Sequence, residues 1–128
     1  MRILNVHIKP SEIPTYRTYL DKRLISFTRN MQQRLYVLID KTLDPIYGCV
    51  QGGHAVAQWL LDHPSQSWNN NYLIYLEADI DKWKERLEYL GIDYTSFQEP
   101  DLKNQITSLA ILGNEKLFKH LKLINNRK

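Results

Sequence analysis

The 128-residue sequence has one cysteine, Cys49, and no long apolar run. A lone cysteine cannot form an internal disulfide and has no partner thiol for a cysteine-rich zinc site. The longest apolar stretches, such as Leu35–Ile39, fall far short of the ~20 residues that a membrane-spanning helix needs. These absences argue against a disulfide scaffold, a zinc module and an integral membrane protein.

The histidines are scattered along the chain. The four histidines, His7, His54, His63 and His120, show neither H-x-x-x-H nor H-E-x-x-H spacing, the arrangements that place two metal ligands on one helix face. We therefore expect no metal and no cofactor. The sequence lacks the basic, apolar and small-residue regions of a secretory signal, so we expect a soluble, cytoplasmic protein that does not contact membranes.

The net charge of +3 is unevenly distributed. Residues 1–30 carry six Lys and Arg against two Asp and Glu, residues 31–111 carry six against eleven, and residues 112–128 carry five against one. An acidic middle between basic ends differs from the broad basic face of a dedicated nucleic-acid binder. The basic ends can still contact phosphate in a salt-dependent way, although solvated tails are the simpler explanation.

The composition changes near residue 31. We interpret 1–30, which holds one weakly alternating stretch and two prolines, as an N-terminal appendage, and 31–128 as the domain. Within the domain, the continuous apolar runs 35–39 and 72–76 predict strands buried on both faces. Looser alternation predicts further strands over 92–97 and 106–111, and helical periodicity lies between or after these strands. The order predicts an α/β fold of three layers, in which a four-stranded mixed sheet carries helices on both faces.

The first helix is predicted from an apolar stripe. Val50, His54, Ala57 and Leu61 follow one another at steps of four, three and four residues, and the helix ends before Pro64. In folds of this class, ligands bind outside the carboxyl ends of the parallel strands. The segment after the first strand, the end of the second strand and the loop after the third converge there, so we expect the functional site at that edge.

The later helices are predicted mainly from their ends. Asp79 is a favourable N-cap for the second helix, and Gly91 suits the left-handed residue that follows a helix. A last helix is predicted to open at 113–114 and to turn the apolar residues of 117–121 inward, with a short strand over 123–124.

Two motifs could carry chemistry. The first is Gln51-Gly52-Gly53-His54, where paired glycines weaken the helix and are tolerated where another group approaches closely. Its His54 is interpreted either as a structural, hydrogen-bonded histidine or as a general base near neutral pH. The second is Glu99-Pro100-Asp101, in which the proline restricts Glu99 to an extended conformation and so aims its carboxylate. This second motif suits acid–base chemistry. The alternative interpretation of the same motif is a turn whose charges are only solvated.

Short motifs across the domain occur in a recognisable order. They read G-H-A-V at 53–56, L-G-I at 90–92, E-P-D-L at 99–102 and H-L-K-L at 120–123. In this order they resemble the type 2 peptidyl-tRNA hydrolase family over some 90 residues, about 35–124, and most closely a divergent branch from phages and bacteria. Each motif alone is weak, and the shared order makes the resemblance moderately specific.

The resemblance implies a metal-free hydrolase that cleaves the ester between a peptide, or an N-blocked amino acid, and tRNA. It implies that Glu99 orients or deprotonates a water and that Thr107 helps to hold the substrate. The family has a lysine where this chain has Tyr47, and the segment after Glu99 is shorter than in the family. The predicted catalytic residues are Glu99, Thr107 and His54, and the predicted substrate-binding residues are Asp40, Gln51, Tyr47 and Asp101.

The resemblance also implies tRNA as a partner and a homodimer as the assembly. Two further hypotheses remain open. One is a non-catalytic protein on the same fold that binds RNA, a nucleotide or a protein partner. The other is an enzyme for a different small substrate, with Glu99 and Asp101 as its acid–base pair.

Overall fold

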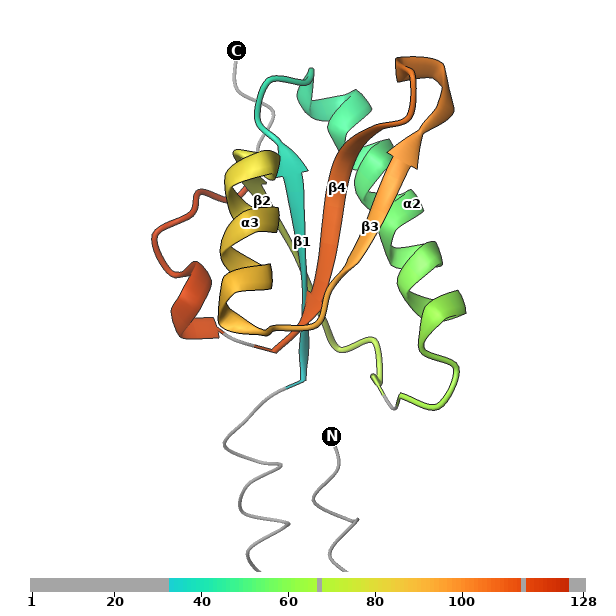
Figure 1. Ribbon diagram of the computed structural model, residues 1–128. Coiled ribbons are helices and arrows are strands. Elements are labelled where there is room, and N and C mark those ends of the chain that lie inside the picture. The colour runs from blue at the N-terminus through green and yellow to red at the C-terminus, as the bar shows by residue number, and fades with distance from the viewer. Residues whose placement is uncertain (1–32, 67, 114, 125–128) are drawn as a thin grey trace, which may run out of the picture.

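The computed structural model describes residues 33–66, 68–113 and 115–124, so the predicted appendage 1–30 lies outside the described residues. In the described part, a four-stranded mixed sheet carries helices on both faces, which confirms the predicted α/β class (Figure 1). The elements in chain order are β1 (Arg34–Asp40), α2 (Pro45–Asp62), β2 (Tyr72–Ala78), α3 (Ile80–Leu90), β3 (Thr95–Glu99), the 3₁₀ turn η2 (Pro100–Leu102), β4 (Gln105–Leu112) and the 3₁₀ turn η3 (Glu115–Phe118).

The sheet order is β2-β1-β4-β3. Strand β1 pairs in parallel with β2 and antiparallel with β4, and β3 pairs antiparallel with β4. Strands β1, β2 and β3 therefore run in the same direction. Their carboxyl ends share one edge with the start of β4, as predicted. An irregularity in the pairing between Phe97 and Gln98 displaces the end of β3 just before Glu99.

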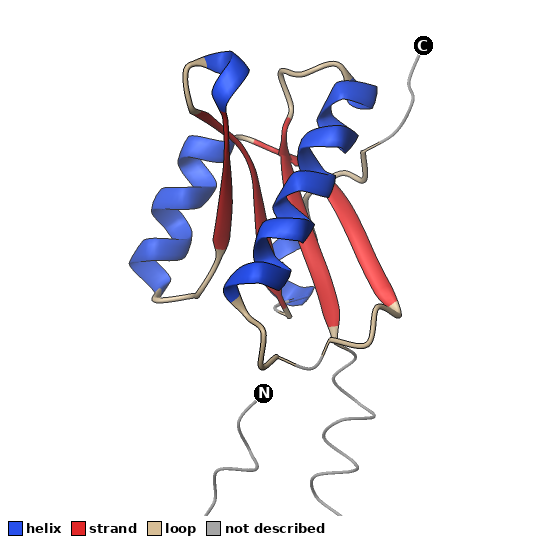
Figure 2. Ribbon diagram, turned by 90° about the vertical axis from the view of Figure 1, so that its right-hand side faces the viewer, coloured by secondary structure: helices blue, strands red, loops and turns tan. Residues whose placement is uncertain are grey.

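Alternate residues of β1 enter two separate cores. Leu35, Val37 and Ile39 pack in the cluster under α2, whereas Tyr36 and Leu38 pack in the cluster under α3. All five are at most 4% exposed, because helices cover both faces of the strand (Figure 2). This burial explains why the strand is a continuous apolar run, and it confirms the prediction for 35–39.

Helix α2 begins earlier than predicted. Its N-cap is Asp44, whose carboxylate accepts hydrogen bonds from the backbone N–H groups of Ile46 and Tyr47 at 3.1 and 3.3 Å. Pro45 occupies the first turn, where its missing N–H costs nothing. Tyr47 therefore lies on the helix and not in a loop.

The predicted apolar face of α2 is wrong. The stripe of Val50, His54, Ala57 and Leu61 is exposed, with Leu61 at 75%. The periodicity of the larger apolar side chains indicated this stripe, but the buried face is made mostly by small residues, with one glutamine and one tryptophan. The buried residues of the helix are Gly48, Gln51, Gly52, Ala55 and Trp59.

The small residues bring α2 close to the sheet. A Cβ at Gly48 would lie 2.8 Å from Cγ2 of Ile39, and a Cβ at Gly52 would lie 2.9 Å from Cε2 of Tyr75. Such distances are below ordinary van der Waals contact, so any larger residue requires the helix or these side chains to move. The close approach places Gln51, between the two glycines, within reach of β3 and β4.

Helix α3 has the predicted ends, and the last predicted helix does not form. The Asp79 carboxylate accepts from the backbone N–H of Lys82 at 3.2 Å, and Gly91 has a left-handed φ of 69°. After β4, only η3 forms, because the chain then turns back to the sheet edge. There Leu123 makes an isolated antiparallel bridge with Leu76, which replaces the predicted short strand.

Candidate functional site

The side chain of Gln51 is fully buried between α2 and the sheet, and both ends of its amide are hydrogen-bonded. Its Nε2 donates to Oε1 of Glu99 at 2.7 Å, and its Oε1 accepts from Oγ1 of Thr107 at 2.5 Å. An ionised carboxylate only accepts, so the NH₂ group of the amide must face Glu99. Ser108 adds a hydrogen bond from Oγ to the Gln51 backbone carbonyl at 2.8 Å. One glutamine thus joins α2, β3 and β4.

Glu99 is held in one orientation at the end of β3. Its backbone is extended (φ −86°, ψ 112°), as the following proline predicts, and its Oε2 accepts from the backbone N–H of Asp101 at 3.0 Å. The Asp101 N–H and then the Gln51 amide lower the pKa of Glu99 below its ordinary value of 4.5. With 8% of its surface exposed, Glu99 is an almost buried carboxylate that is charged at neutral pH.

Tyr47 and Asp101 both lie beside Glu99. Desolvation, followed by the charges of Glu99 and Asp101, raises the pKa of the Tyr47 hydroxyl, which therefore stays protonated as a hydrogen-bond donor. Asp101 is exposed, and it contacts Glu99 through its backbone N–H. Two of the predicted substrate-binding residues therefore adjoin the predicted catalytic carboxylate.

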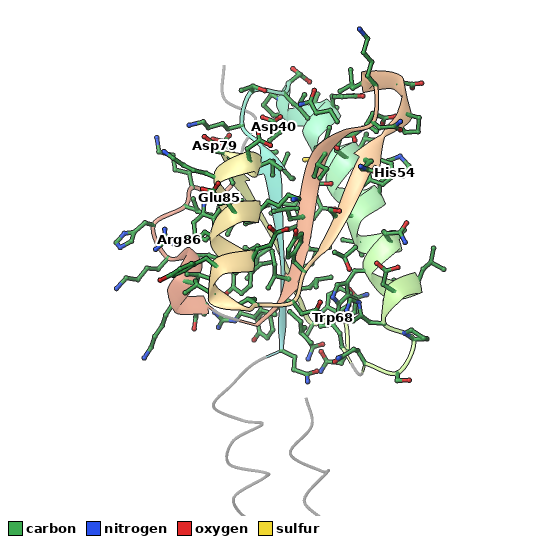
Figure 3. All side chains as sticks on the ribbon, in the orientation of Figure 1. Asp40, His54, Trp68, Asp79, Glu85 and Arg86 are labelled. Atoms are coloured by element: carbon green, nitrogen blue, oxygen red, sulfur yellow. The ribbon has the colours of Figure 1, made fainter. Side chains whose placement is uncertain are left out.

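His54 is exposed on α2, so it does not lie in the core, and the structure leaves both the structural and the general-base interpretation as predictions. Its ring stacks on Phe97 of β3, with a centroid distance of 4.5 Å and an interplanar angle of 14°. Figure 3 shows His54 on the side of α2 that faces β3. The ring also contributes to lowering the pKa of Glu99 through its charge, after the two hydrogen bonds. Its assignment as a general base stays a prediction.

Asp40 lies at the same edge but in a separate group of hydrogen bonds. Its Oδ1 accepts from the backbone N–H and the hydroxyl of Thr42 at 2.9 and 2.8 Å, and its Oδ2 accepts from Nε2 of Gln105 at 3.1 Å. Figure 3 places Asp40 at the end of β1, away from His54 on α2. These bonds tie the end of β1 to the start of β4, beside the group around Glu99.

Three contributing residues were missed in the sequence: Phe97, Gln105 and Ser108. Ser108 had a usable signal, because Thr107 and Ser108 are adjacent polar residues inside the apolar run of β4, and both are fully buried. Buried hydroxyls in a strand need partners, which predicts a polar group on the covering helix. Phe97 and Gln105 carry no such signal, because the packing of α2 on β3 brings His54 to Phe97 and the pairing of β1 with β4 brings Asp40 to Gln105.

The chain has no match among protein-family models or curated protein sequences. In the described ranges, no group of three or more His, Cys, Asp and Glu side chains could hold a metal ion. None of the helices described there is long and apolar enough to cross a membrane.

Proposed function

We propose that the protein is a hydrolase of the type 2 peptidyl-tRNA hydrolase kind, acting on the ester between a peptide, or an N-blocked amino acid, and the 3′ ribose of tRNA. The observation that carries the proposal is the buried hydrogen-bond network of Gln51, Glu99 and Thr107. It holds an ionised carboxylate at the sheet edge where α/β folds bind ligands.

The chemistry requires one water and one carboxylate. Glu99 uses one lone pair on each oxygen for Gln51 and Asp101, and its remaining lone pairs can accept from a water. The water oxygen attacks the ester carbonyl carbon while its proton moves to Glu99. The carbon–oxygen bond to the ribose then breaks, and the same proton passes to the ribose oxygen.

The other residues have supporting roles in this proposal. Thr107 is fully buried, so it acts on Glu99 through Gln51 and does not touch the substrate. The Tyr47 hydroxyl, beside Glu99, is placed to donate to the water or to the substrate. The exposed ring of His54, supported from behind by Phe97, offers a stacking surface for a base at the tRNA end.

A second candidate is a binding protein without activity. Ester hydrolysis needs a positive group or strong donors for the negative charge that develops on the carbonyl oxygen. In the described part of the chain, no Lys or Arg is hydrogen-bonded to Glu99, and Tyr47 stands where the family has a lysine. These features favour binding of RNA, a nucleotide or a protein partner at this edge without cleavage.

One experiment separates the candidates. A labelled N-blocked aminoacyl-tRNA is incubated with the protein, and release of the label and retention of the tRNA in a native gel are measured together. Release by the parent supports the hydrolase, and retention without release supports the binding protein. Neither release nor retention, with protein that is folded by circular dichroism, contradicts the hydrolase and also contradicts a protein that binds tRNA. Turnover of a small ester in that case points to the third hypothesis, with Glu99 and Asp101 as its acid–base pair.

A further inference from the structure

The face of α2 that points away from the sheet is apolar. Figure 2 shows the helix in front of the sheet, with no other described element over its outer side. The large side chains on this outer face are Ile46 (68% exposed), Val50 (53%), Leu60 (49%) and Leu61 (75%). Exposed apolar patches on a domain mark interaction surfaces, whereas single exposed apolar side chains need no explanation. The outer face of α2 therefore has the features of a contact surface.

Charge distinguishes this face from the surface of the other helix. From Pro45 to Leu61, α2 contains no Lys, Arg, Asp or Glu, whereas six of the eleven residues of α3 are charged. A helix that only faces water carries polar and charged residues on its outer side, as α3 does. The charges at the two ends of α2, Asp44 and Asp62, are both negative. The outer side of α2 thus fits a partner that is apolar in its centre and positive at its flanks.

The segment before β1 has this chemistry in its sequence. Residues 16–29 lie outside the described residues, and they carry four Lys and Arg against one Asp. Within this range, Tyr16, Leu20, Leu24 and Phe27 recur at steps of four, four and three residues, which predicts the apolar stripe of an amphipathic helix. The sequence therefore predicts a helix with an apolar side and positive flanks immediately before the domain.

The place where this segment joins the domain suits the outer face of α2. Gly48, near the start of α2, lies against Ile39 at the end of β1, so the helix runs antiparallel to the strand. The other end of α2 therefore lies over the start of β1, where the preceding chain joins the sheet (Figure 1). Residues 28–33 can extend over about 20 Å, more than the roughly 10–12 Å thickness of the helix layer between the sheet and the outer face.

We propose that residues 16–27 form a helix that packs along the outer face of α2 and adds a further layer to the domain. This helix runs parallel to α2, because it must end where β1 begins. Tyr16 and Phe27 are eleven residues apart, as are Val50 and Leu61, so the two stripes match with Tyr16 on Val50 and Phe27 on Leu61. The inference goes beyond the proposed activity and does not depend on it.

The size of the face favours a tethered segment over a separate molecule. A helix of 18 residues is about 27 Å long and about 10 Å wide, so a single helix laid along it buries less than the roughly 1,200 Å² of specific, stable complexes. A separate molecule would bind such a face only weakly. A segment that a few residues join to the domain has an effective concentration in the roughly millimolar range, so the same contact forms within one chain.

A spin label on α2 tests the position of this segment in the full chain. Cys49, the only cysteine of the chain, is exposed on α2 beside Val50, so it can carry a nitroxide without any substitution. We expect the label to remove most of the amide NMR signal of residues 16–27. A label at Tyr89→Cys, in a Cys49→Ser background, is the matched control. It should leave those signals intact, because α3 covers the opposite face of the sheet.

A pair of substitutions tests which side of the segment makes the contact. With the label at Cys49, Leu24→Glu places a charge in the predicted stripe and should restore the signals of residues 16–27. Ile25→Glu, on the opposite side of the predicted helix, should leave these signals lost as in the parent. The proposal is overturned if the Cys49 label does not reduce the signals of residues 16–27, or if the two substitutions act alike. It is also overturned if a label on one molecule removes the signals of another in a mixed sample, because a second copy then covers the face.

Discussion

The Gln51 amide donates to the Glu99 carboxylate at 2.7 Å, across the boundary between α2 and the end of β3. On its other side, the same amide accepts from Thr107 of β4. The orientation and the charge of Glu99 therefore depend on an uncharged residue that lies 48 positions away in the sequence. This dependence makes the network testable without knowledge of the substrate.

Gln51→Ala should lower the free energy of unfolding by about 3 kcal/mol, because it leaves the buried Thr107 hydroxyl without an acceptor and opens a cavity. Gln58→Ala on the same helix is the control. It removes only a hydrogen bond to exposed Asp62, and its effect should stay within about 0.5 kcal/mol. Urea denaturation measures both values. Equal effects of the two substitutions would show that the buried network does not stabilise the fold.

The charge of Glu99 should depend on Gln51. The hydrogen bonds from the Asp101 N–H and the Gln51 amide lower the pKa of Glu99 below 4.5, so this carboxylate stabilises the folded state above the unfolded pKa. That stability is lost as the pH falls through the folded pKa. Carbon NMR titration of the Glu99 carboxyl should give a midpoint below 4.5 in the parent and a higher midpoint in Gln51→Ala. An unchanged midpoint in Gln51→Ala would show that Gln51 does not lower the pKa of Glu99.

His63 forms a second link, between the end of α2 and the segment before β3. Its Nδ1 faces the Trp59 carbonyl at 2.9 Å and its Nε2 faces Oδ2 of Asp93 at 3.0 Å, so both ring nitrogens face acceptors. Burial lowers the pKa of His63, but the hydrogen bonds to Asp93 and Trp59 outweigh it, and the net shift is above the ordinary value of 6.5. The doubly protonated ring therefore fits this position.

This link predicts a pH dependence of stability. A folded pKa raised above the unfolded one gives stability that is complete below about 6.5 and is lost as the pH rises through the folded pKa. In Asp93→Asn, the loss of stability across this pH window should be smaller, because the Asp93 carboxylate that raises the pKa of His63 is gone. Urea denaturation at several pH values measures this loss of stability. The same loss of stability in the parent and in Asp93→Asn would show that His63 does not cause the pH dependence.

The glycines of α2 should respond differently to alanine. Gly48→Ala places a Cβ 2.8 Å from Ile39 Cγ2 and should destabilise the fold by about 1–2 kcal/mol, after the gain in helix propensity. Gly53→Ala meets nothing within 4 Å and should stabilise the fold by up to about 1 kcal/mol. Thermal unfolding measures both. Changes of the same sign would contradict the packing described for this helix.

The sequence predicted those elements whose signal is local. The apolar run of β1 indicated a strand buried on both faces, and Asp79 and Gly91 marked the ends of α3. The buried face of α2 could not be predicted from the periodicity of large apolar side chains. Gly48, Gly52 and Ala55 make most of that face by their small size, beside buried Gln51 and Trp59, and Ile46, Val50, Leu60 and Leu61 lie outside.

The sequence singled out Gln51, Glu99 and Thr107 but not the hydrogen bonds that join them. Pro100 indicated that Glu99 would be extended, and the resemblance singled out Gln51 and Thr107. The bonds among them depend on β3 lying beside β4 and on α2 lying over both, and no local pattern specifies that pairing. The His63 link was missed for the same reason, because its partner Asp93 is 30 residues away.

In the proposed reaction, Glu99, held by Gln51, activates the water that hydrolyses an N-blocked aminoacyl-tRNA. The most direct test is the single-turnover rate of ester cleavage by the parent and by Glu99→Gln, with Gln58→Ala as a matched control. We expect a rate at least about 100-fold lower for Glu99→Gln and an unchanged rate for the control. Cleavage by Glu99→Gln at the parental rate would show that Glu99 does not carry out this reaction.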